Sequence, residues 1–386
     1  MTETQPLDAV EPRHLLARGA VIAVAAIFGL TYSLSAPLIA LNLAERGLSE
    51  ALIGANAAMH AVGVLAVATV LPRLAAWGGV RRTILGALAV AAGALLAFPA
   101  MPSVWLWFPL RILLGGAAEA LFVLSETWIN ELSTESTRAR AMAVYTAALS
   151  LGFALGPLIL SAVGTGGATP YVLGAALTAA AMVLIAVPWV QAPAFHEPAA
   201  GGPLRYLRLA PVAMATTVLN AGIETAGLSF LALYAMGAGW PENEATRLIS
   251  SMMVGAIVLQ LPIGWLGDKV DRRRLLLGLA VVSGLGALLW PFVLHQPVVA
   301  YAVVFTWGGV FVGIYTIMLT MVGSRFKGGE LVGVYAVMGL SWGVGALAGP
   351  AIAGVAMDLV PHGLPLFAAA SCLIFAVFLR RARGDT

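Results

Sequence analysis

Residues 103–130 read SVWLWFPLRILLGGAAEALFVLSETWIN, a stretch that is long and apolar enough for one transmembrane helix. It nevertheless carries Arg111, Glu119 and Glu126, and ionisable side chains are too costly to face lipid. At about 100° and about 1.5 Å per residue, Arg111 lies about 80° and about 12 Å from Glu119, and Glu126 lies about 20° from Glu119. The three groups share one arc with Asn130. We therefore expect this arc to face a polar interior.

The composition excludes an ordinary soluble protein. The chain has 386 residues, of which 60% are hydrophobic and 10% are charged, whereas soluble domains average about 25% charged residues. The single cysteine, Cys372, excludes an internal disulfide and a cysteine-rich metal site. The five histidines are scattered without metal-ligand spacing, so we expect no metal and no cofactor.

Charge-free stretches predict twelve transmembrane helices, and so an all-α integral membrane protein. Two of these stretches are long enough for two spans each, 141–195 and 275–324. Two further spans carry charge, 103–130 and 209–236. The remaining charge-free stretches are 19–44, 51–72, 83–100, 248–267, 331–357 and 359–379.

The basic residues predict the orientation of the chain. If the N-terminus is inside, all of the 21 Lys and Arg residues lie in inner segments except Arg46, Arg111 and Arg247. This bias places both termini in the cytoplasm and explains the net charge of +3 without any affinity for nucleic acid. The first twelve residues are polar and acidic, which is not typical of a signal peptide. We therefore expect a multi-pass protein of the bacterial inner membrane.

The two parts of the chain repeat each other. The Gly-Gly pairs that begin at Gly115 and Gly308 are 193 positions apart, and the basic runs that end at Arg82 and Arg274 are 192 apart. A near-constant offset in the same order indicates two homologous six-helix bundles. In this plan a substrate site lies between the halves near mid-membrane. The predicted parts are a cytoplasmic tail at 1–18, a bundle at 19–190, a cytoplasmic linker at 191–208 and a second bundle at 209–383.

Three motifs resemble those of the major facilitator superfamily. Gly264-Trp-Leu-Gly-Asp-Lys-Val-Asp-Arg-Arg273 resembles its signature loop, although Asp271 replaces the second glycine, and the first-half counterpart at 71–82 lacks the acid. Arg111-Ile-Leu-Leu-Gly115 resembles the helix 4 motif whose buried arginine is associated with proton coupling. Leu151-Gly-Phe-Ala-Leu-Gly-Pro157 resembles the helix 5 motif that is common in antiporters. The resemblance implies a carrier with a small-molecule substrate, a lipid surrounding and a monomeric form.

Three residues of the stretch 103–130 are candidates for proton coupling. Glu119 lies near mid-membrane, where a buried carboxyl could take up and release a proton, and Arg111 could hold it charged in one state. The plainer alternative is a permanent ion pair. Glu126 lies nearer the inner mouth, where it could act as a gate or simply be a solvated interfacial acid.

Glu224 is a candidate for a proton or substrate contact, because it is the only charged residue in its span and Asn220 lies one turn earlier on the same face. A hydrogen bond in the protein core is the alternative. Histidine can titrate at physiological pH, and aromatic rings can stack on a ligand, although a lone histidine more often makes a hydrogen bond between helices and each ring more often serves helix packing. The other candidates are Tyr32, Ser35, Asn56, His60, Trp307, Tyr315 and Trp342.

The signature loop is a candidate gate. We expect Asp268, with Lys269, Arg272 and Arg273, to form an inter-helix lock that closes the cytoplasmic side in one state. The alternative is that these basic residues only set the orientation of the chain.

These observations predict a secondary active transporter that works by alternating access, with proton-coupled efflux of a drug or metabolite as the first interpretation. A proton-linked importer and an anion carrier that uses Arg111 are the alternatives within the same architecture. An enzyme would need a nucleophile–base pair or a metal cluster near a membrane face, and the sequence offers neither. A receptor with a transporter fold would differ by its lack of flux.

Overall fold

The computed structural model describes residues 12–133, 135–187, 190, 209–326 and 328–382, and within these residues every regular element is a helix. The predicted linker at 191–208 lies outside the described residues. The N-terminal half contains α1 (Pro12–Glu45), α2 (Glu50–Gly78), α3 (Val80–Ala100), the short 3-10 helix η1 (Val104–Leu106), α4 (Trp107–Glu131), α5 (Glu135–Val163) and α6 (Thr169–Ala186).

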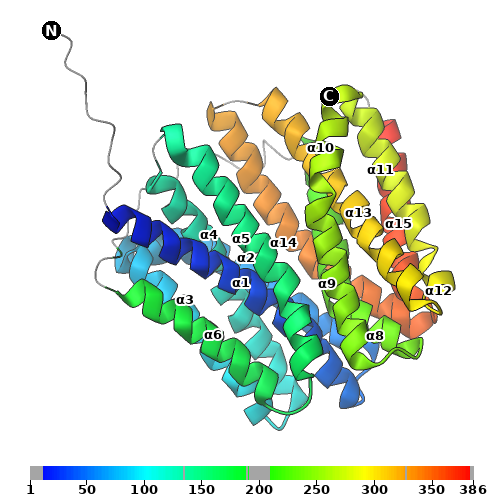
Figure 1. The fold of residues 1–386 in the computed structure, drawn as a ribbon, viewed down its shortest axis with the longest axis horizontal. Helices are drawn as coiled ribbons and strands as arrows, with labels where there is room; N and C mark the ends of the chain where they lie inside the picture. Colours follow the sequence, from blue (N-terminus) through cyan, green and yellow to red (C-terminus); the bar gives the residue numbers. More distant parts are fainter. Residues whose placement is uncertain (1–11, 134, 188–189, 191–208, 327, 383–386) are drawn as a thin grey trace.

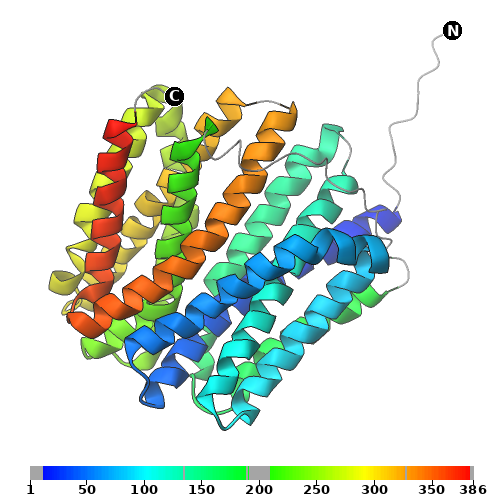
Figure 2. The ribbon, with the colours of Figure 1, turned by 180° about the vertical axis from the view of Figure 1, so that it is seen from behind.

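The C-terminal half repeats this order with two interruptions. It contains α8 (Pro211–Gly237), α9 (Glu242–Val258), α10 (Gln260–Lys269), α11 (Arg272–Ala287), α12 (Trp290–Val293), α13 (Pro297–Arg325), α14 (Gly328–Leu359) and α15 (Gly363–Arg381). Figures 1 and 2 show the two halves side by side as bundles of long, tilted helices.

The prediction of twelve crossings is confirmed in its architecture, with one refinement. Eleven stretches of the described residues are long and apolar enough to cross a membrane, α9 and α10 together counting as one. The remaining crossing is split, because α11 has 16 residues and is followed by the short α12. Pro291 explains the break, since proline lacks a backbone N–H and disfavours helical geometry in the residue before it.

Arginines at equivalent positions cap the last helix of each half. Arg81 donates to the carbonyl oxygens of Ile185 and Val187 at 2.9 and 3.0 Å, around the end of α6. Arg273, 192 positions later, donates to the carbonyl oxygen of Leu379 at 2.7 Å in the last turn of α15. Helix ends leave carbonyl groups without partners and carry partial negative charge, so an arginine suits both places. The basic runs therefore have a structural task besides orientation.

Close helix packing within each half depends on glycine at equivalent positions. A Cβ atom on Gly115 in α4 would lie 2.0 Å from the carbonyl oxygen of His60 in α2. A Cβ atom on Gly308 in α13 would lie 2.3 Å from the carbonyl oxygen of Met252 in α9. Only glycine permits this backbone approach, which is how membrane helices gain packing energy without a hydrophobic driving force.

The two halves meet mainly along two pairs of helices, and α1 also contacts α8. α2 packs along α14, as Figure 2 shows, and α5 packs along α9 on the face seen in Figure 1. We call the side where α1 begins and α15 ends the terminal side, and the opposite side, where α1 ends and α2 begins, the distal side.

Gly115→Ala tests the close packing of α2 against α4. We expect it to lower the stability of the folded protein by about 1–3 kcal/mol, because the added methyl group meets backbone that cannot rotate away. The measurement is the midpoint of thermal unfolding in detergent. Gly93→Ala is the matched control, since a Cβ atom there meets nothing within 4 Å. Equal midpoints for the two variants would contradict the packing account.

Candidate functional site

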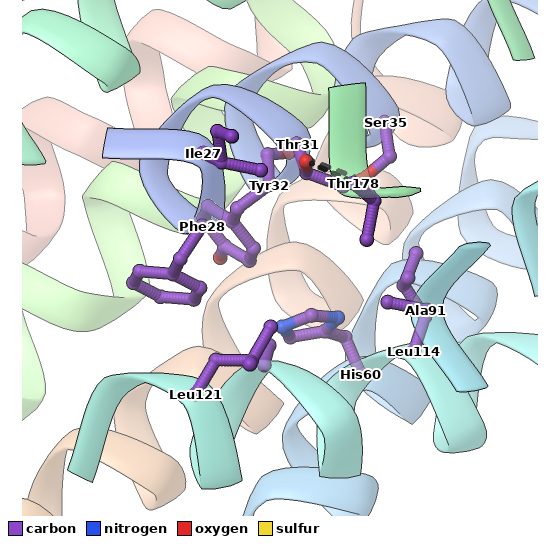
Figure 3. Close-up of a pocket in the computed structure, with 11 residues that line it drawn as sticks. Ile27, Phe28, Thr31, Tyr32, Ser35, His60, Ala91, Leu114, Leu121 and Thr178 are labelled. Carbon is purple, nitrogen blue, oxygen red and sulfur yellow. Dashed lines mark hydrogen bonds between the residues drawn. The ribbon is translucent and has the colours of Figure 1, made fainter. Parts of the chain in front are cut away.

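A group of polar side chains from α1, α2 and α4 lies buried at the centre of the N-terminal half. The rings of Tyr32 in α1 and His60 in α2 lie 4.8 Å apart between centroids. Arg111 in α4 interacts electrostatically with both. Asn56 lies one turn before His60 in α2. Figure 3 shows the side chains of Tyr32 and His60 extending from α1 and α2 into the space between these helices.

Several atoms of this group lack hydrogen-bond partners among the described residues. They are Nδ2 of Asn56, Nδ1 of His60, and Nε and Nη1 of Arg111. The side chains are 1%, 4% and 3% exposed, so water does not reach these atoms. An unpaired buried polar group costs about 1–3 kcal/mol, and more if it is charged. So many unpaired groups in one place indicate a site whose partners come from elsewhere.

The C-terminal half contributes acceptors from α8. Asn220 donates from Nδ2 to Oε2 of Glu224 at 3.1 Å, while its own Oδ1 has no partner among the described residues. Ala61 and Ala221, the neighbours of His60 and Asn220, pack together in one buried cluster with Ala346. The polar groups of the two halves therefore lie at one level of the interface.

A small cavity adjoins the group. It measures about 20 Å³, which is room for about one water molecule. Phe28, Tyr32 and His60 line it, and Thr31 and Thr178 face each other across α1 and α6 with their hydroxyl oxygens 3.4 Å apart (Figure 3). Ser35 also lines the cavity, but its hydroxyl donates to the Tyr32 carbonyl oxygen at 3.2 Å.

Among the lining residues that were not predicted from the sequence are Phe28, Thr31 and Thr178. Phe28 lies one turn before Tyr32 on the same face of α1, and its ring is stacked at 6.3 Å from that of Tyr32. Helical spacing from Tyr32 could have found Phe28. No sequence signal pairs Thr31 with Thr178.

The two acids of α4 lie apart from Arg111 in this conformation. Glu119 and Glu126 are half-buried, and neither pairs with Arg111 within ion-pair distance in the described part of the chain. Glu126 instead interacts electrostatically with Tyr145 and with Tyr315 of the other half. The permanent ion pair considered for Glu119 and Arg111 is therefore not formed here, and the roles of both acids stay predictions.

The aromatic candidates of the C-terminal half separate into two places. Tyr315 is half-buried and interacts electrostatically with Glu224, and Trp342 packs on the cluster of Ala61 and Ala221. Trp307, in contrast, donates from Nε1 to the Ser283 carbonyl oxygen at 2.8 Å and stacks on Phe311. Trp307 thus packs between α11 and α13, away from the central group, and we leave it out of the proposed site.

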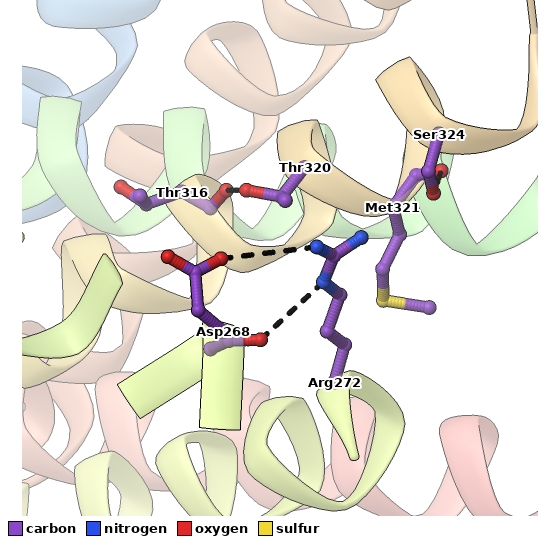
Figure 4. Close-up of polar contacts among 7 residues, drawn as sticks. Asp268, Arg272, Thr316, Thr320, Met321 and Ser324 are labelled. Atoms are coloured by element: carbon purple, nitrogen blue, oxygen red, sulfur yellow. Dashed lines mark hydrogen bonds and ion pairs between the residues drawn. The ribbon is translucent and has the colours of Figure 1, made fainter. Parts of the chain in front are cut away.

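The signature loop does not join the halves in this conformation. Asp268 is 76% exposed on its side chain, and its Oδ1 lies 3.9 Å from Nη2 of Arg272 on the same loop (Figure 4). Lys269 lies over the Trp265 ring at 3.7 Å, and Arg273 holds α15. Asp268 and Arg272 thus lie close together across the turn between α10 and α11 within one half, and closure of the cytoplasmic side by this loop stays a prediction.

The distal side is closed instead by two carboxylates that accept from backbone N–H groups across the interface. Asp358, near the end of α14, accepts from Glu50 and Ala51 at 2.8 and 3.1 Å. Glu242, at the start of α9, accepts from Thr165 at 2.8 Å. We call these contacts the distal latches.

Two side-chain hydrogen bonds lie beside the second latch. Arg247 donates from Nε to the Ser161 hydroxyl at 2.7 Å, and the Ser250 hydroxyl donates to the Ala154 carbonyl oxygen at 3.0 Å. Like the latches, both join opposite halves in the distal part of their helices. These contacts together bind the halves on the distal side of the central group.

Comparison with known proteins gives the family. The family model described as Major Facilitator Superfamily matches residues 21–246 and again 213–385. An uncharacterized MFS-type transporter of Escherichia coli (strain K12), YcaD, is 25% identical over 384 residues, which cover 97% of each chain.

Solved structures agree on the fold. A mutant of the nucleoside transporter NupG superposes with a TM-score of 0.81 at 13% identity, covering 96% of this chain and 100% of that one. A D-xylose-proton symporter gives 0.76 at 14% identity and covers 96% of this chain and 98% of its own. Because the family model matches nearly the whole chain, this protein belongs to the Major Facilitator Superfamily, whose members are membrane carriers rather than enzymes.

Proposed function

We propose that this protein is a secondary active transporter that carries a small molecule across the bacterial inner membrane by alternating access. The observation that supports this most is the pairing of a buried central group that lacks partners among the described residues with an interface latched on its distal side. A carrier needs a site at the interface of two halves that can part on either side. This arrangement offers such a site.

We assign the terminal side to the cytoplasm because nearly all Lys and Arg residues lie on that side of the predicted spans. The conformation described above then faces inward. The distal latches would have to break for the site to open outward, while the signature loop would engage on the terminal side. Asp268, Lys269, Arg272 and Arg273 are exposed or bound within their own half here, which leaves them free to change partners.

We propose that proton movement is coupled to this exchange through Glu119 and Glu224, with Arg111 and Glu126 modulating it. Glu224 is half-buried on α8 and accepts a hydrogen bond from Asn220. Glu119 is half-buried on α4 and has no ion-pair partner among the described residues. A carboxyl in such surroundings is stable only when neutral or paired, so its protonation can be tied to conformation. Efflux of a drug or metabolite is the proposed direction.

Loss of the distal latches should open the distal side. We expect Asp358→Ala combined with Glu242→Ala to raise the outward-open population several-fold, because each latch contributes a few tenths to about 1 kcal/mol. The measurement is the distance between spin labels at Leu52 and Leu359, two exposed residues of α2 and α14, in a Cys372→Ala background. Glu45→Gln, an acid at the distal end of α1, is the matched control. An unchanged distance distribution in the double variant would contradict the proposal that these contacts hold the distal side closed.

Proton coupling should appear as a pH dependence of the same distance. We expect the wild-type distribution to shift between about pH 5.5 and about pH 8, because a carboxyl in the core must change its charge for the halves to rearrange. Glu119→Gln and Glu224→Gln should each reduce the shift, whereas Glu45→Gln should leave it intact. If both core variants respond to pH as the wild type does, neither carboxyl carries the coupling.

A further inference from the structure

The unpaired polar atoms of the central group differ in kind between the two halves. The N-terminal half offers donors, Nδ2 of Asn56 and Nε and Nη1 of Arg111. The C-terminal half offers acceptors: Oδ1 of Asn220, which has no partner among the described residues, and beside it the carboxylate of Glu224, which already accepts from Asn220. His60 can serve as either through Nδ1, depending on its tautomer. A molecule that satisfies both halves needs acceptor atoms at one end and a donor at the other.

Among these groups, the charged side chain of Arg111 has the greatest need for a binding partner. Its side chain is 3% exposed, and the described residues hold no acid within ion-pair distance of it. A guanidinium group does not lose its proton in a protein, so the charge stays. A buried cation without a counter-ion is among the costliest features of a folded chain, and more so within a membrane. An anionic group on the ligand would remove this cost.

One small molecule can reach both halves. Ala61 and Ala221 pack together, which sets the neighbouring His60 and Asn220 at one level of the interface. Tyr32 lies near enough to Arg111 and to Glu224 to interact electrostatically with both. The small cavity in Figure 3 lies within the N-terminal half, where Tyr32 and His60 line it beside these groups.

The charge balance favours a singly charged ligand. The group contains one cation, Arg111, and an acid across the interface, Glu224. A phosphate dianion would leave one negative charge without a partner and facing that acid, which is unfavourable in a low dielectric. A carboxylate matches the single guanidinium in charge and in planar shape.

We infer, resting on the proposed transport function, that the substrate is a small organic carboxylate that also carries a hydroxyl or amino group. Its carboxylate oxygens accept from Arg111 and Asn56. Its hydroxyl or amino group donates to Glu224 and Asn220. In this arrangement Arg111 selects the substrate by charge, whereas Glu224 requires a donor at the other end.

The test compares matched acids and neutral amides as ligands of the purified full-length protein. The pairs are glycolate and glycolamide, lactate and lactamide, and 4-hydroxybenzoate and 4-hydroxybenzamide. Binding is measured as stabilisation against thermal unfolding, because a ligand of the folded state raises the unfolding temperature. We expect at least one acid to bind the wild type, and its amide to bind at least about tenfold more weakly, because a charge-assisted hydrogen bond is lost.

Variants identify the residue responsible. Arg111→Gln should abolish the preference for the acid, and Asn56→Ala should weaken acid binding while the preference remains. Arg325→Gln is the matched control, because Arg325 lies at the terminal end of α13 over the Phe326 ring. If Arg111→Gln does not fold, Arg111→Lys keeps the charge but loses the planar fork, and the comparison of acid with amide in the wild type stands without either variant.

Three results would overturn the inference: no acid stabilises the wild type, an amide binds as well as its acid, or acid binding survives intact in Arg111→Gln. The distance between labels at Leu52 and Leu359 separates this failure from a failure of the proposed function. If the distance between the labels changes but no carboxylate binds, only the inferred substrate class is wrong. If the distance between the labels never changes, the protein does not alternate between two conformations, and both the proposed function and the substrate class are contradicted.

Discussion

The cost of keeping the Arg111 guanidinium charged inside an apolar bundle is the constraint on which the rest of the structure depends. The charge cannot be removed by loss of a proton, and it is not paired with an acid within the described residues. The helices around it supply further polar atoms, from Asn56 and His60 on α2 to Tyr32 on α1, rather than a counter-ion. In the function proposed above, the missing partner is a ligand that binds and is released, as a carrier requires.

The duplication explains how the two halves close together on the distal side. Glu50 and Glu242 are 192 positions apart, and Thr165 and Asp358 are 193 apart, the offsets that the sequence repeat shows. Each half therefore brings the same two places to the distal interface. The acids differ, since Asp358 accepts in one latch and Glu242 in the other, yet both use backbone N–H groups as donors.

The fold could be predicted from the sequence because it depends on local or periodic signals. These are the length of the apolar stretches, the uneven distribution of Lys and Arg between the two sides, and the constant offset between the repeated halves. The site followed only in part. Asn56, His60 and Arg111 were predicted and lie together, because a polar residue inside a span must face the interior. Trp307 shows the limit of that reasoning, since an aromatic ring at mid-span can equally face the core of its own half, where it binds the Ser283 carbonyl. The latch of Asp358 joins residues that are 308 positions apart, and no sequence pattern predicts this contact.

The most direct test of the account asks whether the central site is reached from one side at a time. A single cysteine at Tyr315, in the Cys372→Ala background, would be exposed to a membrane-impermeant thiol reagent from each side of oriented vesicles. Tyr315 is half-buried and interacts electrostatically with Glu224. The account predicts labelling from the terminal side alone, and a gain of labelling from the distal side when Asp358 and Glu242 are replaced by alanine. Labelling from both sides at once, or from neither side in either background, would contradict it.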